Sequence, residues 1–199
     1  MTNDDRKIII IGAGGHSSVL VDLIEELNLK AFGVIDPKFQ EKDNMWKKIK
    51  ILEEKEFNNQ KKNKDFVLVN GIGKVLDSHK RKEIFINYKK KSFIFKTLIH
   101  PFSKVSKYST ISEGAQIMAG AVIQSGVEIG PNSIINTGAS VDHDCMIGKN
   151  SHISPGSTIC GETKIGEDCF IGAGALIVNN IEIKSGTVVK AGQIITKSI

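Results

Sequence analysis

The residues best suited to chemistry are a histidine and two flanking aspartates in the second half of the chain, Asp142-His143-Asp144. Histidine has an ordinary pKa of about 6.5, so at neutral pH it can take a proton from an attacking amine or hydroxyl. A neighbouring carboxylate can orient the ring and stabilise its protonated form. Adjacent side chains on a straight strand point to opposite faces, so either aspartate reaches the ring only where the chain bends. The sequence does not decide which aspartate is the partner of His143. It also leaves open that His143 is an exposed residue without a catalytic role.

A glycine-rich segment near the N-terminus, Gly12-Ala13-Gly14-Gly15-His16, is the second candidate site. It lies between the apolar run Lys7–Ile11 and residues 17–27, whose leucines and isoleucines have helical spacing. Backbone N–H groups at the start of a helix bind anions such as phosphates. Ser17 takes the third glycine position of the dinucleotide motif GxGxxG, so the match to that motif is weak. The segment indicates a phosphate site, with a purely structural turn as the alternative, and it argues against hydride transfer.

A six-residue repeat fills the second half of the chain and must position His143. The fourth residue after most repeat positions is small, and glycines recur nearby, as a tightly turning chain requires. A period of six does not match the 3.6-residue period of a helix, and hexapeptide repeats are the signature of a parallel β-helix. Ile or Val stands at every sixth position without a break: Val105, Ile111, Ile117, Ile123, Ile129, Ile135, Val141, Ile147, Ile153, Ile159, Ile165, Ile171, Ile177, Ile183, Val189 and Ile195.

The first half of the chain reads as a small α/β domain, because strands and helices alternate as in a parallel sheet with crossover helices. Residues 40–64 are lysine-rich and carry little pattern, so we expect an exposed excursion there. His100-Pro101 marks the boundary between two domains, 1–100 and 101–199. The expected strands are 7–11, 31–35, 66–69 and 93–98, and the expected helices are 17–27 and 78–88.

Composition narrows the class of protein. The 199 residues carry a net charge of +5: residues 1–104 hold 21 Lys/Arg and 14 Asp/Glu, giving +7, and residues 105–199 hold 6 and 8, giving −2. A basic front half can attract an anionic ligand, but no nucleic-acid recognition motif accompanies it. The sequence has neither a signal peptide nor a run of about 18 apolar residues, so we expect a cytoplasmic protein with no membrane partner. Three cysteines without metal-ligand spacing predict neither a disulfide framework nor a metal site.

Five segments of the chain, taken together, resemble one protein family. They are Ile11-Gly12-Ala13-Gly14-Gly15-His16, Asp36, Asn70-Gly71-Ile72-Gly73, Leu98-Ile99-His100-Pro101 and Ile135-Asn136-Thr137-Gly138-Ala139-Ser140-Val141-Asp142-His143-Asp144-Cys145. The combination resembles bacterial sugar acyltransferases, which include sialic-acid O-acetyltransferases and N-acetyltransferases of UDP-linked 4-amino sugars of the bacillosamine type. The resemblance covers nearly the whole chain. It implies an α/β Rossmann-like N-terminal domain that binds a nucleotide sugar, followed by an all-β left-handed parallel β-helix with eighteen residues in each coil.

The resemblance also assigns roles to single residues. His143 matches the general base of the family, and Asp144 matches the acidic residue that supports it. His152 and Gly161 match positions that contact acetyl-CoA, although His152 also reads as an ordinary surface turn residue. Gly161 should lie one coil from His143 on the same face, with room for the acyl donor and a backbone N–H group nearby for the thioester oxygen. The nucleotide-sugar contacts match Gly14, Gly15, His16, Asp36 and Gly73.

The function that follows is direct transfer of an acetyl group from acetyl-CoA to the amine of a nucleotide-linked 4-amino-4,6-dideoxy sugar, in a homotrimer with sites between neighbouring coils. Two alternatives stay open: O-acetylation of sialic acid or a related nonulosonic acid, and a non-catalytic scaffold that binds a sugar nucleotide. One departure concerns the end of the chain. Many relatives carry a Gly-x-Pro-Ala-Lys type segment that caps the coil, whereas this chain reads Thr196-Lys197-Ser198-Ile199.

Overall fold

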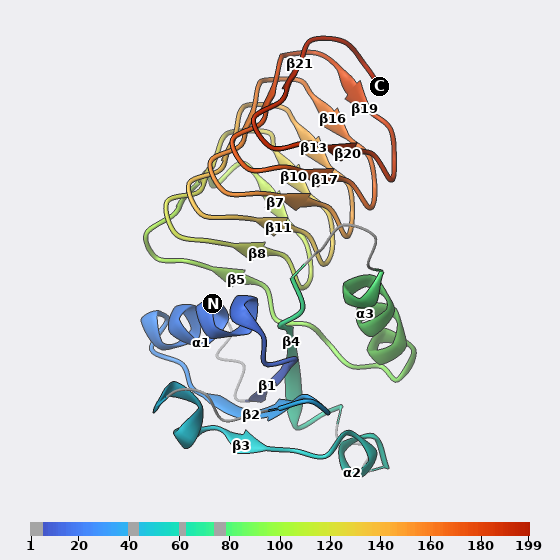
Figure 1. The fold of residues 1–199 in the computed structure, drawn as a ribbon. Helices are drawn as coiled ribbons and strands as arrows, with labels where there is room; N and C mark the ends of the chain where they lie inside the picture. The colour runs from blue at the N-terminus through green and yellow to red at the C-terminus, as the bar shows by residue number, and fades with distance from the viewer. Residues whose placement is uncertain (1–5, 40–43, 60–62, 74–78) are drawn as a thin grey trace. The chain divides into compact units, whose positions relative to one another are not determined.

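The computed structural model describes residues 6–39, 44–59, 63–73 and 79–199. The chain divides into two compact units, an N-terminal unit of residues 1–96 and a C-terminal unit of residues 97–199 (Figure 1). Within the described residues, no helix is both long and apolar enough to cross a bilayer.

The N-terminal unit is built on a four-stranded parallel sheet in the order β3-β2-β1-β4. In β1, four consecutive isoleucines are buried, as expected of a strand that is covered on both faces. Helix α1 buries Leu20, Leu23 and Ile24, the residues with helical spacing. The elements of this unit are β1 (Lys7–Ile11), α1 (Gly15–Glu26), β2 (Ala31–Ile35), η1 (Asn44–Lys48), β3 (Lys50–Ile51), α2 (Glu54–Asn59), β4 (Phe66–Asn70) and α3 (Lys80–Lys90).

Two expectations for this unit are wrong. Residues 40–64 are not a simple exposed excursion: β3 pairs with β2, and Trp46, Ile49 and Phe57 are buried in the part that the structure describes. A two-residue strand and one-turn elements are too short to show a period in the sequence. The expected strand at 93–98 is also absent, because Phe95 makes only an isolated bridge to Leu68. Ser78, the expected first residue of the last helix, lies outside the described residues.

The C-terminal unit is a parallel β-helix of two-residue strands arranged in three parallel sheets (Figure 1). Each strand pairs with the strand eighteen residues further on, for example Ser140 with Thr158, so three hexapeptides form one coil as expected. The left hand of the coil stays a prediction from the resemblance. Sheet 1 holds β5 (Leu98–Ile99), β8 (Gln116–Ile117), β11 (Ile134–Ile135), β14 (His152–Ile153), β17 (Phe170–Ile171) and β20 (Val188–Val189). Sheet 2 holds β6 (Lys104–Val105), β9 (Val122–Ile123), β12 (Ser140–Val141), β15 (Thr158–Ile159), β18 (Leu176–Ile177) and β21 (Ile194–Ile195). Sheet 3 holds β7 (Thr110–Ile111), β10 (Glu128–Ile129), β13 (Met146–Ile147), β16 (Lys164–Ile165) and β19 (Glu182–Ile183).

The repeat residues of the sequence form the interior of this coil. The Ile and Val side chains at every sixth position pack into one apolar cluster, and small residues such as Ala139, Cys145 and Cys169 fill the places beside them. The coil starts one hexapeptide earlier than the repeat count predicted, because Leu98 and Ile99 pair with Gln116 and Ile117. At the other end, the N–H group of Ile199 donates to the oxygen of Glu182, and the N–H group of Lys184 donates to the oxygen of Ile199.

Most corners of the coil turn through one residue with positive φ. Asn and Asp reach this left-handed conformation more easily than other residues with side chains, which explains their place at many corners. We number each corner by the sheets it joins. The positive-φ residues are Gly120, Gly138, Gly156, Gly174 and Gly192 at corner 1–2; Gly126, Asp144, Glu162 and Asn180 at corner 2–3; and Gly114, Asn132, Asn150, Asp168 and Gly186 at corner 3–1.

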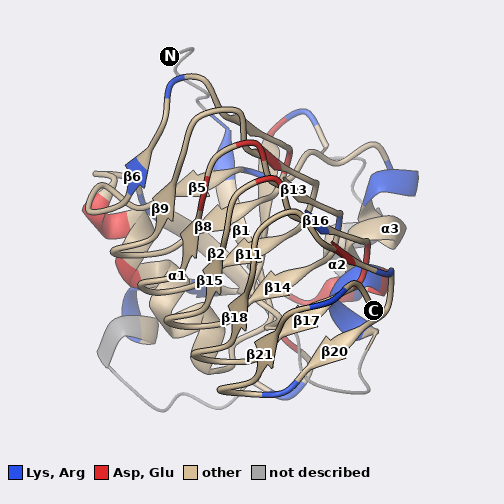
Figure 2. Ribbon diagram, turned by 90° about the horizontal axis from the view of Figure 1, so that it is seen from above, with Lys and Arg blue, Asp and Glu red and all other residues tan. Residues whose placement is uncertain are grey.

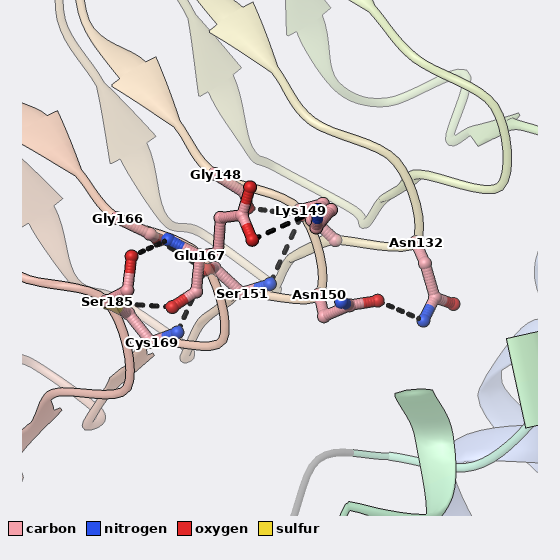
Figure 3. A network of polar contacts seen from close by, with 10 residues as sticks. Asn132, Gly148, Lys149, Asn150, Ser151, Gly166, Glu167, Cys169 and Ser185 are labelled. Carbon is pink, nitrogen blue, oxygen red and sulfur yellow. Dashed lines mark hydrogen bonds and ion pairs between the residues drawn. The ribbon is translucent and has the colours of Figure 1, made fainter. Parts of the chain in front are cut away.

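Corner 3–1 carries a ladder of polar contacts between successive coils (Figure 3). The Asn132 amide donates to Oδ1 of Asn150 at 2.9 Å, and Lys149 forms an ion pair with Glu167 at 3.1 Å. The hydroxyl of Ser151 donates to the carbonyl oxygen of Gly166 at 2.9 Å. The Ser151 hydroxyl gives a partner to a backbone carbonyl at the corner, and the two contacts between side chains tie successive coils together, so corner 3–1 contributes to the stability of the coil.

Candidate active site

His143 and Asp144 lie together at corner 2–3, between the end of β12 and the start of β13. Asp144 has a φ of 56°, and this bend brings its side chain to the side of the chain that His143 occupies. Oδ2 of Asp144 lies 2.9 Å from Nδ1 of His143. The backbone on both sides is fixed, because the Asp144 N–H group donates to Ser125 and the Glu162 N–H group donates to the oxygen of His143, each at 3.0 Å.

The two flanking aspartates do different work. Oδ1 of Asp142 accepts the backbone N–H group of His143 at 2.8 Å, so Asp142 stabilises the turn and acts on the ring only through its charge. Asp144 is the residue that contacts the imidazole. Of the two alternatives that the sequence left open, the geometry therefore favours Asp144 as the partner of the base.

The electrostatics of the pair suit a general base. An ionised carboxylate only accepts hydrogen bonds, so Nδ1 carries the proton and Nε2 presents its lone pair. The hydrogen bond that His143 donates to Asp144 raises the pKa of His143 above its ordinary value, and the nearby charges of Asp142 and Glu162 act in the same direction. The His143 and Asp144 side chains are 53% and 65% exposed in the single chain, so a substrate can approach the pair.

Gly161 lies directly against the ring of His143, one coil further on. A Cβ atom at position 161 would lie 2.6 Å from Nε2 and 2.7 Å from Cε1. The structure thus brings together His143, Asp144 and Gly161, as the eighteen-residue spacing predicted. The N–H group of Glu162 is already engaged by the oxygen of His143, so it is not available to a thioester oxygen.

His152 is in a different part of the coil. It belongs to β14 in sheet 1 and is only 8% exposed, so its interpretation as a surface turn residue is wrong. Its Nε2 lies 3.0 Å from the side-chain nitrogen of Asn136, and its ring meets Phe170 edge to face at 5.2 Å. Within the chain the structure does not place His152 at corner 2–3 with His143, and contact with acetyl-CoA stays a prediction for it.

The glycine loop of the N-terminal unit leaves its backbone open. Gly14 is the N-cap of α1 without a side-chain cap, and the first turn of this helix carries no acidic residue. A Cβ atom at Gly14 or Gly15 would meet no atom within 4 Å. Both glycines are exposed, so an anionic group can approach the positive end of the helix dipole there.

The other residues expected to contact the sugar nucleotide gather around the same loop. Oδ2 of Asp36 accepts the N–H group of Ala13, and Oδ1 accepts the N–H group of Lys38, each at 2.8 Å. A Cβ atom at Gly73 would lie 3.4 Å from Cβ of His16. A pocket lined by Gly12, Asp36, Ile72, Lys80 and other residues opens at the carboxyl ends of β1 and β2, where ligands of open α/β sheets bind.

Two buried polar residues have contacts that their place in the sequence did not predict. Ser17 is fully buried, and its hydroxyl lies 2.7 Å from the oxygen of Gly12 and 2.9 Å from the oxygen of Gly71. This contact explains why a serine replaces the third glycine of GxGxxG. Arg81 is 3% exposed, and Nη1 donates to the oxygens of Asn70 and Ile72 at 2.9 and 2.7 Å. Burial lowers the pKa of Arg81 to about 9, which still leaves it charged at neutral pH.

Arg81 lies in a helix that shows mainly lysines in the sequence, so only the structure distinguishes it. The basic residues of α3 are blue in Figure 2. Arg81 is buried, and its guanidinium donates to the backbone oxygens of residues 70 and 72. The Asn70 side chain donates in return to the oxygen of Arg81 at 2.9 Å. The charge pattern of a helix in the sequence does not predict such a contact.

Family models match both units. Residues 7–88 match the PglD N-terminal domain. Residues 108–142 and 127–161 match the bacterial transferase hexapeptide (six repeats), and residues 162–197 match the hexapeptide repeat of succinyl-transferase. No curated protein sequence matches the chain.

Solved structures match the chain over almost its full length. The acetyltransferase domain of PglB from Neisseria gonorrhoeae in complex with acetyl coenzyme A is 33% identical, with 98% of this chain and 93% of that chain covered and a TM-score of 0.89. PerB from Caulobacter crescentus in complex with CoA and GDP-perosamine is 28% identical, with 97% and 90% covered and a TM-score of 0.86. WeeI from Acinetobacter baumannii, at 22% identity and a TM-score of 0.84 over 98% and 93% of the two chains, shares the fold. The chain therefore belongs to the hexapeptide-repeat family of bacterial sugar acyltransferases.

Proposed function

We propose that this protein is an acetyl-CoA-dependent N-acetyltransferase that acts on the amine of a nucleotide-linked 4-amino-4,6-dideoxy sugar. The observation that carries the proposal is the pairing of His143 with Asp144, with the His143 side chain more than half exposed and its Nε2 beside Gly161. No hydrogen bond within the described residues engages Nε2, so its lone pair is available to the amine of the sugar that accepts the acetyl group.

The reaction needs only one proton-accepting group on the protein. The acceptor nitrogen attacks the carbonyl carbon of the thioester while Nε2 of His143 takes a proton from that nitrogen. The tetrahedral intermediate then collapses, the carbon–sulfur bond breaks, and CoA leaves as a thiolate that takes up a proton. Asp144 holds the ring in the required tautomer and stabilises the imidazolium that forms.

The identity of the acceptor is supported by the relatives and by the N-terminal unit. One similar structure is described as GDP-perosamine N-acetyl transferase from Caulobacter crescentus, in complex with CoA and GDP-perosamine. The open backbone at Gly14 and Gly15 in this chain suits the phosphates of such a sugar nucleotide. We place the sugar nucleotide at Gly14, Gly15, His16, Asp36 and Gly73, and acetyl-CoA at Gly161 and His152.

We further propose that the active enzyme is a homotrimer. In the single chain more than half of the His143 and Asp144 side-chain surface is exposed, whereas acyl transfer is favoured where water is excluded. Apolar side chains such as Met146 and Ile194 are exposed on two outer faces of the coil, as expected of surfaces that pack against another copy. The mass in solution by light scattering tests this point, and a monomer would contradict it. We place the reaction in the cytoplasm, because its charged substrates do not cross a bilayer unaided.

The function is tested by measuring free thiol released from acetyl-CoA in the presence of a panel of acceptors. The panel holds UDP-, dTDP- and GDP-linked 4-amino sugars beside free and CMP-linked sialic acids, with the His143→Ala variant as control. Turnover of an amino sugar by the wild type alone supports the proposal. Turnover of sialic acids only would replace it by O-acetylation, and binding of a sugar nucleotide without any turnover would favour the scaffold.

A further inference from the structure

Corner 2–3 stacks one residue of each coil above the next. Gly126, Asp144 and Glu162 are eighteen residues apart and have φ values of 74°, 56° and 60°. Backbone hydrogen bonds join Asp144 to the coil before it and Glu162 to the coil of His143. The backbone of Asp144 therefore has little freedom, and the place of its carboxylate depends on what lies beside its side chain.

Gly126 is the neighbour of that carboxylate. A Cβ atom at position 126 would overlap Oδ1 of Asp144 and would lie 3.2 Å from its Cγ. The other oxygen of the same carboxylate, Oδ2, is the atom that accepts Nδ1 of His143 at 2.9 Å. Any side chain at position 126 must therefore rotate the carboxylate and disturb this hydrogen bond.

The fold itself does not require a glycine at this position. Asp144, Glu162 and Asn180 occupy the same place in later coils with similar positive φ values. Other corner glycines with positive φ are surrounded by open space: a Cβ atom at Gly156, Gly174 or Gly186 would meet no atom within 4 Å. Gly126 is thus distinguished by its contact with Asp144, and turn geometry alone does not account for it.

We propose that Gly126 is a positioning residue of the active site, whose missing side chain leaves the space in which the Asp144 carboxylate lies against His143. It acts through Asp144 and does not touch the reacting atoms. With Gly161 on the other side, the His143–Asp144 pair lies between two glycines, one from the coil before it and one from the coil after it. The inference rests on the proposed acetyl transfer.

The test compares Gly126→Ala with Gly186→Ala. Both glycines have a similar φ, 74° and 77°, so alanine brings the same backbone strain to each, but only position 126 contacts Asp144. We expect Gly126→Ala to lower kcat/KM for the amino sugar by about 10-fold to 100-fold through kcat, because small misplacements of catalytic groups have effects of this size. Gly186→Ala should stay within about twofold of the wild type. Equal losses in the two variants would overturn the proposal.

A double variant separates positioning from general damage. In an Asp144→Ala background, Gly126→Ala should bring no further loss, because the carboxylate that it displaces is gone. Losses that multiply would show that Gly126 acts independently of Asp144 and would refute the inference. If Gly126→Ala does not fold, Gly126→Asn replaces it, since asparagine already occupies such corners at Asn132 and Asn150.

An NMR titration of the His143 ring measures its pKa and so tests the contact with Asp144 without any turnover. Asp142, Asp144 and Glu162 are the charged groups that face the ring, and Gly126→Ala moves only the second of them. The pKa of His143 should therefore fall toward its ordinary value in Gly126→Ala and stay unchanged in Gly186→Ala. An unchanged titration in Gly126→Ala would sink the proposal, whereas a lowered pKa in an enzyme inactive on every acceptor would contradict only the proposed function.

Discussion

The two candidate sites of this protein are built from different parts of the chain. In the β-helix, the groups offered to a substrate are the exposed side chains of His143 and Asp144, and the backbone behind them is locked by hydrogen bonds between coils. In the N-terminal unit, the groups offered are backbone N–H groups at Gly14 and Gly15. Buried side chains fix the neighbouring backbone: Ser17 bonds the oxygens of Gly12 and Gly71, and Arg81 bonds those of residues 70 and 72. Proton transfer needs a titratable atom, whereas binding an anion needs only fixed backbone dipoles.

This contrast is tested most strongly at His143. His143→Ala removes the only atom that we assign to proton transfer, so kcat should fall by about 10²-fold to 10⁴-fold, the usual contribution of a general base. The KM for the sugar nucleotide should change little, because backbone groups of the other unit bind it. Steady-state kinetics with released thiol measures both values, and a large rise in KM with an unchanged kcat would reverse the division of roles.

Asp144→Asn probes the same site through pH. The carboxylate raises the pKa of His143, and the base works only when it is neutral, so activity in the wild type is lost as pH falls through that raised pKa. In Asp144→Asn the pKa falls, so the acidic limb of the kcat/KM profile should move to lower pH while kcat at the plateau drops about 10-fold. A limb that stays in place would separate Asp144 from the base. Asp142→Asn, which removes the carboxylate from the backbone contact, should move the limb less.

Arg81→Lys addresses the N-terminal unit. A lysine cannot reproduce the planar fork that reaches the oxygens of Asn70 and Ile72, and these buried carbonyls would lose their partner. We expect the KM for the sugar nucleotide to rise about fivefold, equivalent to about 1 kcal/mol, with kcat and the pH profile unchanged. A fall in kcat at constant KM would contradict the separation of the two sites.

Ser17→Ala should have the smallest effect of the series. It removes one hydroxyl between the oxygens of Gly12 and Gly71, at a cost of about 1 kcal/mol in the free energy of unfolding. Thermal denaturation should show a Tm lower by a few degrees, and KM should rise no more than about threefold. Ser18→Ala, one residue further along the same helix, is the matched control and should leave both unchanged.

The sequence predicted regular features better than contacts between distant segments. The repeat of Ile and Val indicated the β-helix, because one period is repeated along the whole unit and each residue type is fixed by the interior. The eighteen residues of each coil followed only from the family resemblance. It did not indicate β3 or α2, since elements of two to six residues show no period. Leu98 and Ile99 were assigned to the wrong unit because an apolar pair fits either a sheet or a coil.

The candidate sites show the same limit. Residue type pointed to His143 and its two flanking aspartates, and the family resemblance with its eighteen-residue coil added Gly161. The structure places His143, Asp144 and Gly161 together. The choice between Asp142 and Asp144 needed the φ of one residue, which a sequence does not state. Arg81 and Gly126 were missed for one reason: each acts through a contact with a residue at least ten positions away, and an arginine or a glycine by itself is compatible with many roles.

The strict pairing of each strand with the strand eighteen residues on has a consequence for how such a chain can change its length. Insertion or loss of a whole coil beyond Asn180 would lengthen or shorten the shaft while every side chain kept its face and the catalytic corner stayed intact. A change of six or twelve residues would keep the interior filled but move each later corner to another edge of the triangle, and a change that is not a multiple of six would take the Ile and Val side chains out of the interior. The β-helix can therefore change its length in evolution only by whole coils, and single residues can be added only where a loop leaves a corner.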